Sequence, residues 1–237
     1  MRLEDLNWFD VQGYLEQDDR LMLVLGACEQ HAYLSLLTDV RIPLALGDAA
    51  SQKSGVLLAP PLNFGASPYF LDYPGTISLR VSTLNAVVGD LVDSVYRHGF
   101  RKLLFLNGHG GNQGVRELLS EKANQLAGLR ISWYAWFDSH SVQAILEKHE
   151  IKGYHASWFE AFPFNQVGEL PDRSKTPPYV PGLLSAAQAR EVYGDGSMGG
   201  DYRPDPALLD EIFLAAVADI LQLLRFEEES GPSREGS

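Results

Sequence analysis

The 237-residue sequence is poor in cysteine and in long apolar runs, and each shortage excludes a class of protein. Cys28 is the single cysteine, so the chain cannot form an internal disulfide, which fits a reducing compartment. No run of about 18 apolar residues exists, so no membrane span is expected. The first ten residues contain acids and no apolar stretch, which argues against a signal peptide. We therefore expect a cytoplasmic protein.

Basic residues are also scarce. The chain has 19 lysines and arginines against 31 aspartates and glutamates, for a formal net charge of -12 at pH 7. A nucleic-acid binder needs a basic face to neutralise phosphates, and an anionic membrane surface likewise attracts cations. We therefore expect neither partner. A small-molecule substrate remains possible, even an acidic one, because a bound metal ion can supply local positive charge.

Several catalytic motifs are missing as well. There is no Gly-x-Ser-x-Gly elbow, so the Gly-His-Gly-Gly stretch at 108–111 does not indicate an esterase. There is no G-x-G-x-x-G after the first expected strand and no P-loop, so nucleotide-binding folds of those types have no support.

What the sequence does contain is an alternation of short apolar runs and amphipathic stretches. Hydrophobic residues make up 45% of the chain, enough for a substantial core. The sequence predicts a buried strand at 20–27 and further strands at 56–59, 102–106 and 130–136. Helices are expected from about Asp39, with Thr38 as N-cap, and at 82–98, 113–126, 141–149, 185–193 and 206–226.

This alternation predicts an α/β fold, a three-layer α/β/α sandwich with a mostly parallel central sheet. No linker is long enough to divide the chain. We therefore expect a single domain over residues 1–228, followed by a flexible C-terminal tail over 229–237.

Three polar clusters carry the candidate chemistry. Glu29 and His31, closed by Asp39, follow the first expected strand, and His109 lies in the glycine-rich turn after the third. The third cluster, Gly153-Tyr154-His155-Ala156 with Glu160, lies in an irregular stretch. In open parallel sheets, ligands bind beyond the carboxyl ends of the strands, where the first two clusters fall.

Imidazole and carboxylate are ligands that hold Zn²⁺ or Mn²⁺. In an extended segment Glu29 and His31 point the same way, and a carboxylate such as Asp39 can bridge two metals. Simpler interpretations stand beside this one. A Glu-x-His pair is common by chance, the glycines around His109 could cradle a phosphate, and His155 and Glu160 could form a surface pair.

Taken in order, the motifs resemble the creatininase (creatinine amidohydrolase) family. The resemblance is carried by GACEQH…TD (26–39), APPLNFGASPYFLDYPGTISL (59–79), GFRKLLFLNGHGGN (99–112), GYHASWFE (153–160) and YGDGSMGGDYRPDPALLDEIF (193–213). The first block is one residue shorter than the family's usual form, and Ala32, Tyr33 and Leu34 stand where its glycine and second histidine are missing.

The resemblance implies a two-metal centre with Zn²⁺ and/or Mn²⁺, two per chain. Its expected residues are the metal ligands Glu29, His31, Asp39, His109 and Glu160, with Asp39 as the bridge, and His155 as the acid/base. Creatininase itself has a glutamate where this chain has Gly111, and Glu160 is the candidate replacement. Residues expected to bind substrate are Gly75, Thr76, Gly110, Asn112 and Trp158.

The activity implied is that of a metal-dependent amidohydrolase. It would cleave a C–N bond of a small cyclic amide, a formamide or a related compound with a metal-bound hydroxide. The alternatives are a peptide-cleaving family member and a catalytically silent homologue that binds a metabolite or serves as a structural subunit. The resemblance also implies a homo-oligomer, namely a hexamer.

Overall fold

The computed structural model describes residues 1–226, so the expected tail over 229–237 lies outside the described residues. The strands are β1 (Arg20–Leu25), β2 (Leu57–Leu58), β3 (Lys102–Asn107), β4 (Arg130–Ala135), β5 (Ser174–Lys175) and β6 (Gly200–Asp201). The α-helices are α1 (Trp8–Leu15), α2 (Thr38–Ser54), α3 (Val81–His98), α4 (Val115–Gln125), α5 (His140–Lys148), α6 (Ala186–Tyr193) and α7 (Pro206–Leu223). The prediction of a single domain over 1–228 stays a prediction.

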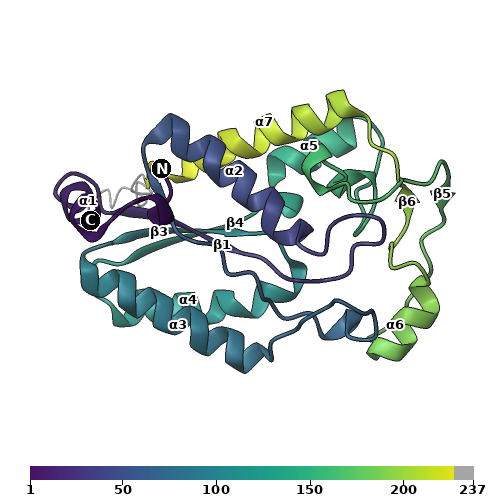
Figure 1. The fold of residues 1–237 in the computed structure, drawn as a ribbon, viewed down its shortest axis with the longest axis horizontal. Coiled ribbons are helices and arrows are strands. Elements are labelled where there is room, and N and C mark those ends of the chain that lie inside the picture. Colours follow the sequence, from purple (N-terminus) through teal and green to yellow (C-terminus); the bar gives the residue numbers. More distant parts are fainter. Residues whose placement is uncertain (227–237) are drawn as a thin grey trace, which may run out of the picture.

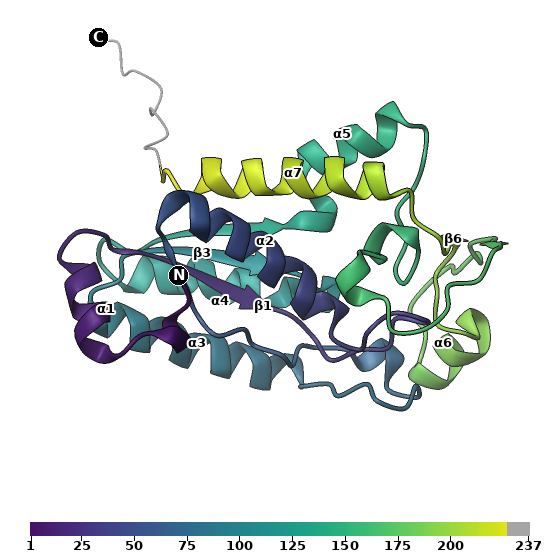
Figure 2. The ribbon, with the colours of Figure 1, turned by 45° about the horizontal axis from the view of Figure 1, so that its top comes forward.

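The central sheet has the strand order β2-β1-β3-β4, and every neighbouring pair is parallel. Helices α2, α5 and α7 lie on one side of this sheet, and α3 and α4 lie on the other (Figure 1). The three-layer α/β/α architecture is therefore confirmed. Helix α1 and helix α6 lie at opposite ends of the molecule, with the sheet between them (Figure 2).

Both faces of the sheet are buried, and successive residues of each strand serve opposite faces. In β1, Met22 and Val24 belong to the hydrophobic cluster that packs with α2, α5 and α7, whereas Leu21 and Leu23 belong to the cluster shared with α3 and α4. Strands β1 and β3 are buried after their first residue and mostly apolar, whereas β4, at the edge of the sheet, is largely half-buried. Polar side chains therefore gather where the strands end.

The predicted elements are present, with small differences at their ends. Thr38 is not the N-cap of α2 but its first residue. The N-cap is Leu37, and the Thr38 hydroxyl donates to the carbonyl of Ser35 at 2.7 Å. The last helix ends at Leu223, three residues before the predicted end. No helix within residues 1–226 has the length and apolar character needed to cross a membrane.

Helix α1 was not predicted. It is short and buries no residue completely, so its apolar pattern is weak. A signal for it existed in Asn7 and Asp10. Their side chains form a reciprocal capping box, in which each accepts a hydrogen bond from the other residue's backbone amide.

Candidate metal centre

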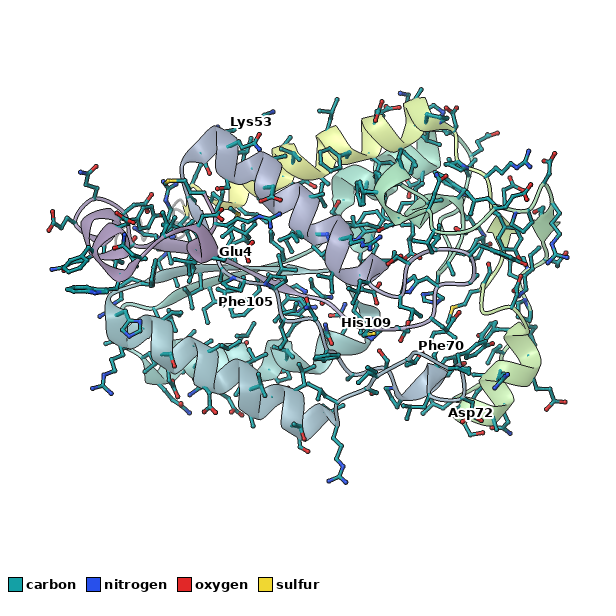
Figure 3. The ribbon with its side chains drawn as sticks, viewed as in Figure 1. Glu4, Lys53, Phe70, Asp72, Phe105 and His109 are labelled. Carbon is teal, nitrogen blue, oxygen red and sulfur yellow. The ribbon has the colours of Figure 1, made fainter. Side chains whose placement is uncertain are left out.

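The polar residues after β1 and β3 meet the first turn of α2 beyond the carboxyl end of the sheet. Two glycines allow this close approach. A Cβ added at Gly108 would lie 1.9 Å from the backbone oxygen of Asp39, and one at Gly26 would lie 2.5 Å from a methyl carbon of Val40. His109 lies beyond β3 on the side of the molecule that carries α6, and Phe70 lies farther in the same direction (Figure 3).

Asp39 lies at the middle of this cluster and is 3% exposed. One carboxylate oxygen, Oδ1, is 3.0 Å from Nε2 of His31. The other, Oδ2, is 2.9 Å from Nδ1 of His109. The two oxygens of one carboxylate thus face two different imidazoles, as a bridging ligand requires.

Three groups of three side chains each bring one ligand atom to within 4.8 Å of the others, and one of them is Glu29 with His31 and His155. The other two are Glu29 with Asp39 and His109, and His31 with Asp39 and Glu160. Every residue in both groups is buried, and Asp39 belongs to both. Two adjacent cation sites that share one carboxylate would have this arrangement.

Backbone carbonyls fix the orientation of both imidazoles. Nδ1 of His31 lies 3.0 Å from the carbonyl of Glu29, and Nε2 of His109 lies 2.9 Å from the carbonyl of Ala66. A proton held on each of these nitrogens would donate to the carbonyl and leave the opposite nitrogen free for a metal. In each ring that opposite nitrogen is the one that faces Asp39.

The fit to a metal can be judged from unpaired atoms. Nε2 of His31 and Oδ2 of Asp39 are buried and have no hydrogen-bond partner of good geometry among the described residues. Their nearest charged neighbours are Oδ1 of Asp39 and Nδ1 of His109, respectively. Buried polar atoms normally have partners, so such atoms need an explanation. Nitrogen and carboxylate oxygen donors without sulfur suit Zn²⁺ or Mn²⁺.

Glu160 reaches the cluster from η5 (Trp158–Glu160). Its Oε2 accepts a hydrogen bond from the Ala156 amide at 2.7 Å and lies 3.8 Å from Nε2 of His31. Ala156 adopts a left-handed backbone conformation, with φ of 55°, which residues other than glycine seldom adopt. The backbone therefore supports the position of this carboxylate.

Gly111 could not supply the carboxylate instead. A Cβ at this position would lie 2.0 Å from the backbone oxygen of Ala66 and 2.5 Å from Nε2 of His109. A glutamate at Gly111 would thus displace the turn that holds His109. Glu160 delivers its carboxylate from a different segment without this clash.

His155 lies beside the two groups. Its Nδ1 is 3.8 Å from Oε1 of Glu29, and its ring centroid is 4.4 Å from that of His31. Its Nε2 lies 3.1 Å from the carbonyl of Gln30 and 3.0 Å from the side-chain nitrogen of the same residue. Gln30 can thus satisfy Nε2 with or without a proton. Phe70 stacks on the imidazole at 4.8 Å between ring centroids.

Burial and the neighbouring charges move the pKa values of these groups in opposite directions. For His31 burial opposes protonation, but the Asp39 carboxylate outweighs it and raises the pKa to about 10. For His109 burial is likewise outweighed, by Glu29 and Asp39, and the pKa rises to about 9. Burial opposes the charge of Asp39 too, yet the two imidazoles hold its pKa below the ordinary value.

The other three groups are governed by burial. It raises the pKa of Glu160 to about 7 and raises that of Glu29 above its ordinary value. It lowers the pKa of His155 well below 6.5, with a further contribution from the charge of His31. His155 is therefore neutral near pH 7, whereas His31 and His109 are protonated in the absence of metal.

A cavity of about 510 Å³ lies against this cluster. Of the five residues expected to bind substrate, Gly110 lines the cavity and the other four do not. Thr76 accepts a hydrogen bond from the Gln30 amide at 3.0 Å. Gly75 occupies a turn with φ of 97°, where an added Cβ would meet Leu36 at 2.7 Å.

The remaining two are parts of the scaffold. Asn112 is fully buried, where its side chain accepts from the Ala66 amide and donates to the Gly26 carbonyl, both at 3.2 Å. Trp158 packs in the hydrophobic core and donates from its indole nitrogen to the Lys152 carbonyl. Both therefore lie behind the cavity wall.

Other residues of the wall were not predicted. Ser67 is buried beside His109, with its hydroxyl 3.2 Å from Nε2. The apolar part includes Phe70, Phe137 and Met198, together with Tyr154 of the third polar cluster. These residues lie in short 3-10 helices or in loops, and no periodicity in the sequence indicates which rings face the cavity.

Comparison with known families gives one family model over nearly the whole chain. The creatininase model, described as creatinine amidohydrolase, matches residues 4–224. A creatinine amidohydrolase of Pseudomonas putida is 33% identical over 115 residues, which is 46% of this chain and 44% of the relative. A mycofactocin precursor peptide peptidase of Mycobacterium ulcerans is 35% identical over 136 residues, or 51% of this chain and 53% of the relative. The chain thus spans about half the length of the curated relatives it matches.

Solved structures share the fold over nearly their full length. A crystal structure of creatinine amidohydrolase (creatininase) has a TM-score of 0.84 at 20% identity and covers 97% of this chain and 98% of its own. A structure titled as the Mn form of creatininase has a TM-score of 0.81 at 23% identity, and a mutant of Zn-Zn type has 0.83 at 21%. Each of these two covers 96% of this chain and 98% of its own.

Proposed function

Because the chain belongs to the creatininase family, we propose that it is a metal-dependent amidohydrolase that cleaves a C–N bond of a small cyclic amide, a formamide or a related compound. The proposal depends most on Asp39, whose two oxygens face His31 and His109 in two adjacent groups of candidate ligands. We assign one cation to Glu29, Asp39 and His109 and the other to His31, Asp39 and Glu160.

Two divalent cations held in this way would lower the pKa of a water molecule and polarise a substrate carbonyl. The residues of the chain then control geometry and protons. Asp39 sets the separation of the two sites, and the carbonyls of Glu29 and Ala66 keep both imidazoles oriented toward it.

We assign the proton transfer to His155. Its Nδ1 faces the centre near Glu29, while its Nε2 is held by Gln30. Burial keeps the imidazole neutral, so Nδ1 can accept a proton from the attacking water. The same low pKa makes the resulting imidazolium a ready donor to the departing nitrogen.

Metal analysis tests the function directly. Purified protein reconstituted with Zn²⁺ or Mn²⁺ is expected to hold about two ions per chain, and removal by a chelator should abolish hydrolysis until metal is restored. The assay would screen creatinine, formamidopyrimidines and short peptides. Protein that binds no metal after reconstitution would instead support the catalytically silent alternative.

The second candidate is a peptide-cleaving activity, which is favoured by the identity of 35% to the mycobacterial peptidase over about half of each chain. The substrate screen separates the two. Turnover confined to the peptides would replace the small-amide proposal and leave the assignment of the metal ligands unchanged. The expected homo-hexamer and the cytoplasmic location stay predictions.

Proton release should accompany metal binding. Folding raises the pKa of His31 to about 10 and of His109 to about 9, so both imidazoles stabilise the metal-free fold when protonated, and this stabilisation is lost as the pH rises through those values. Metal ligation needs neutral imidazoles. At pH 7.5, Zn²⁺ binding should therefore release about two protons from these histidines, whereas histidines of ordinary pKa would release about 0.1 each.

Calorimetric titrations in buffers of different ionisation enthalpy measure this number. Binding enthalpies that do not depend on the buffer would show that the imidazoles are already neutral, contrary to the electrostatics of the site.

A further inference from the structure

Apart from the candidate ligands and His155, no charged side chain among the described residues lines the cavity at the metal centre. Its larger members are five aromatic residues and one methionine, namely Tyr69, Phe70, Phe137, Tyr154, Phe159 and Met198. The remaining members are small or otherwise uncharged. A ligand in this cavity would thus have the ligand cluster on one side and mostly apolar surface on the other.

These rings differ in how much exposed surface they present to a ligand. Phe70 and Phe159 are 3% and 4% exposed, so they are fixed parts of the wall. Tyr69, Phe137 and Tyr154 are half-buried and retain surface that a ligand could cover. Aromatic rings pack well against the flat face or edge of another ring, which favours a planar apolar group as their partner.

The position of the wall links this surface to the reacting bond. Phe70 stacks on His155 with an angle of 13° between the ring planes. Phe137 packs at 6.1 Å between centroids against the buried Trp136, which anchors it. An apolar group on these rings would therefore lie directly beside the proton donor and the metal ligands.

The part of the cavity wall beyond the candidate ligands does not favour an anionic group on the substrate. The lining residues include no lysine or arginine. Three buried carboxylates, those of Glu29, Asp39 and Glu160, offset most of the charge of two divalent cations. A phosphate or carboxylate placed among the rings would lose water without gaining a charged hydrogen-bond donor, which is costly.

The size of the cavity indicates more than a minimal substrate. Its volume of about 510 Å³ lies within the range of sites that hold drug-sized ligands. Creatinine is a single small ring, so it would leave much of the apolar surface uncovered.

We propose that the substrate carries an uncharged aromatic or similarly flat apolar group next to the C–N bond that is cleaved, and that Phe137 and Tyr154 bind this group. The inference rests on the proposed amidohydrolase function for the bond itself. The binding of the apolar group requires neither metal nor turnover, so it can be measured separately.

The test uses two probes of nearly equal size, benzamide and 4-carbamoylbenzoate, titrated by ligand-observed NMR into the metal-free and the Zn²⁺-loaded protein. Benzamide should bind at least about tenfold more tightly than the anion to the metal-free protein, because in the loaded form a Zn²⁺ ion could itself bind the carboxylate. Phe137→Ser should weaken benzamide binding by about fivefold or more. Phe9→Ser, which removes an exposed ring on the distant helix α1, is the matched control and should change nothing.

A second variant is designed to gain binding of the anion, because a misfolded protein would lose binding and not gain it. Tyr154→Arg places a cation in the wall and should reverse the preference in favour of 4-carbamoylbenzoate. Equal or tighter binding of the anion to the metal-free unmodified protein would overturn the inference, as would the absence of benzamide binding at about 10 mM in both forms.

The hydrolase proposal can fail separately. Benzamide binding together with no hydrolysis of formanilide or of any compound in the substrate screen by the Zn²⁺-loaded protein would support the apolar site and contradict the enzyme. Hydrolysis of N-methylformamide as efficient as that of formanilide would support the enzyme and overturn the apolar substrate group.

Discussion

Replacement of Asp39 by asparagine is expected to abolish the binding of both metal ions and to lower kcat/KM by at least about 10³-fold. An amide has one good ligand oxygen and no charge, so it cannot bridge two cations as a carboxylate can. The substitution also removes the negative charge that lies 3.0 Å from His31 and 2.9 Å from His109. Metal content by elemental analysis and steady-state kinetics on the same preparation measure both effects.

The matched control is Asp90→Asn, which makes the same chemical change on an exposed turn of α3. It should keep two ions per chain and full turnover. An Asp39→Asn protein that retained both metals and full activity would contradict the bridging role, and with it the assignment of two adjacent sites.

Replacement of His155 by alanine is expected to lower kcat by about 10²–10⁴-fold while leaving metal content near two ions per chain. The side chain holds a proton-exchanging nitrogen 3.8 Å from Glu29 and has its other nitrogen paired with Gln30. Loss of this group removes proton transfer to the departing nitrogen without removing a ligand of either proposed site. Kinetics and metal analysis together give the result.

The metal measurement matters because His155 also forms a group of possible ligands with Glu29 and His31. If His155→Ala lost one ion, His155 would be a ligand and the proton would have to come from another group. His98→Ala, on the exposed end of α3, is the control for a histidine removed without effect. Unchanged turnover in His155→Ala would reject both roles.

The position of the site could be predicted because parallel strands deliver their carboxyl ends to one edge. Glu29 and His109 follow buried strands that pair directly, so their proximity depends on sheet topology alone. The position of Glu160 does not follow from sheet topology. It depends on the left-handed backbone conformation of Ala156, and no local pattern in the sequence indicates that turn.

The cavity wall could not be predicted in the same way. Thr76 and Asn112 belong to motifs that match the family, yet in this chain their side chains bond to the backbone of Gln30 and of Ala66 and Gly26. Tyr154 lies in an irregular segment, and Phe137 lies in the short 3-10 helix Trp136–Asp138 that follows β4. Residues of such segments have no fixed periodicity, so a motif places them near the site without showing which way they point.

The clash that excludes a side chain at Gly111 has a consequence for how firmly each cation is held. Glu29, Asp39 and His109 all lie within a few residues of the sheet edge or in the first turn of α2. The second group of candidate ligands instead includes Glu160, which lies in the long connection between α5 and β5. One ion would therefore occupy a site built from rigid elements, and the other a site completed by a loop. The two ions should thus differ in how fast they exchange with solution.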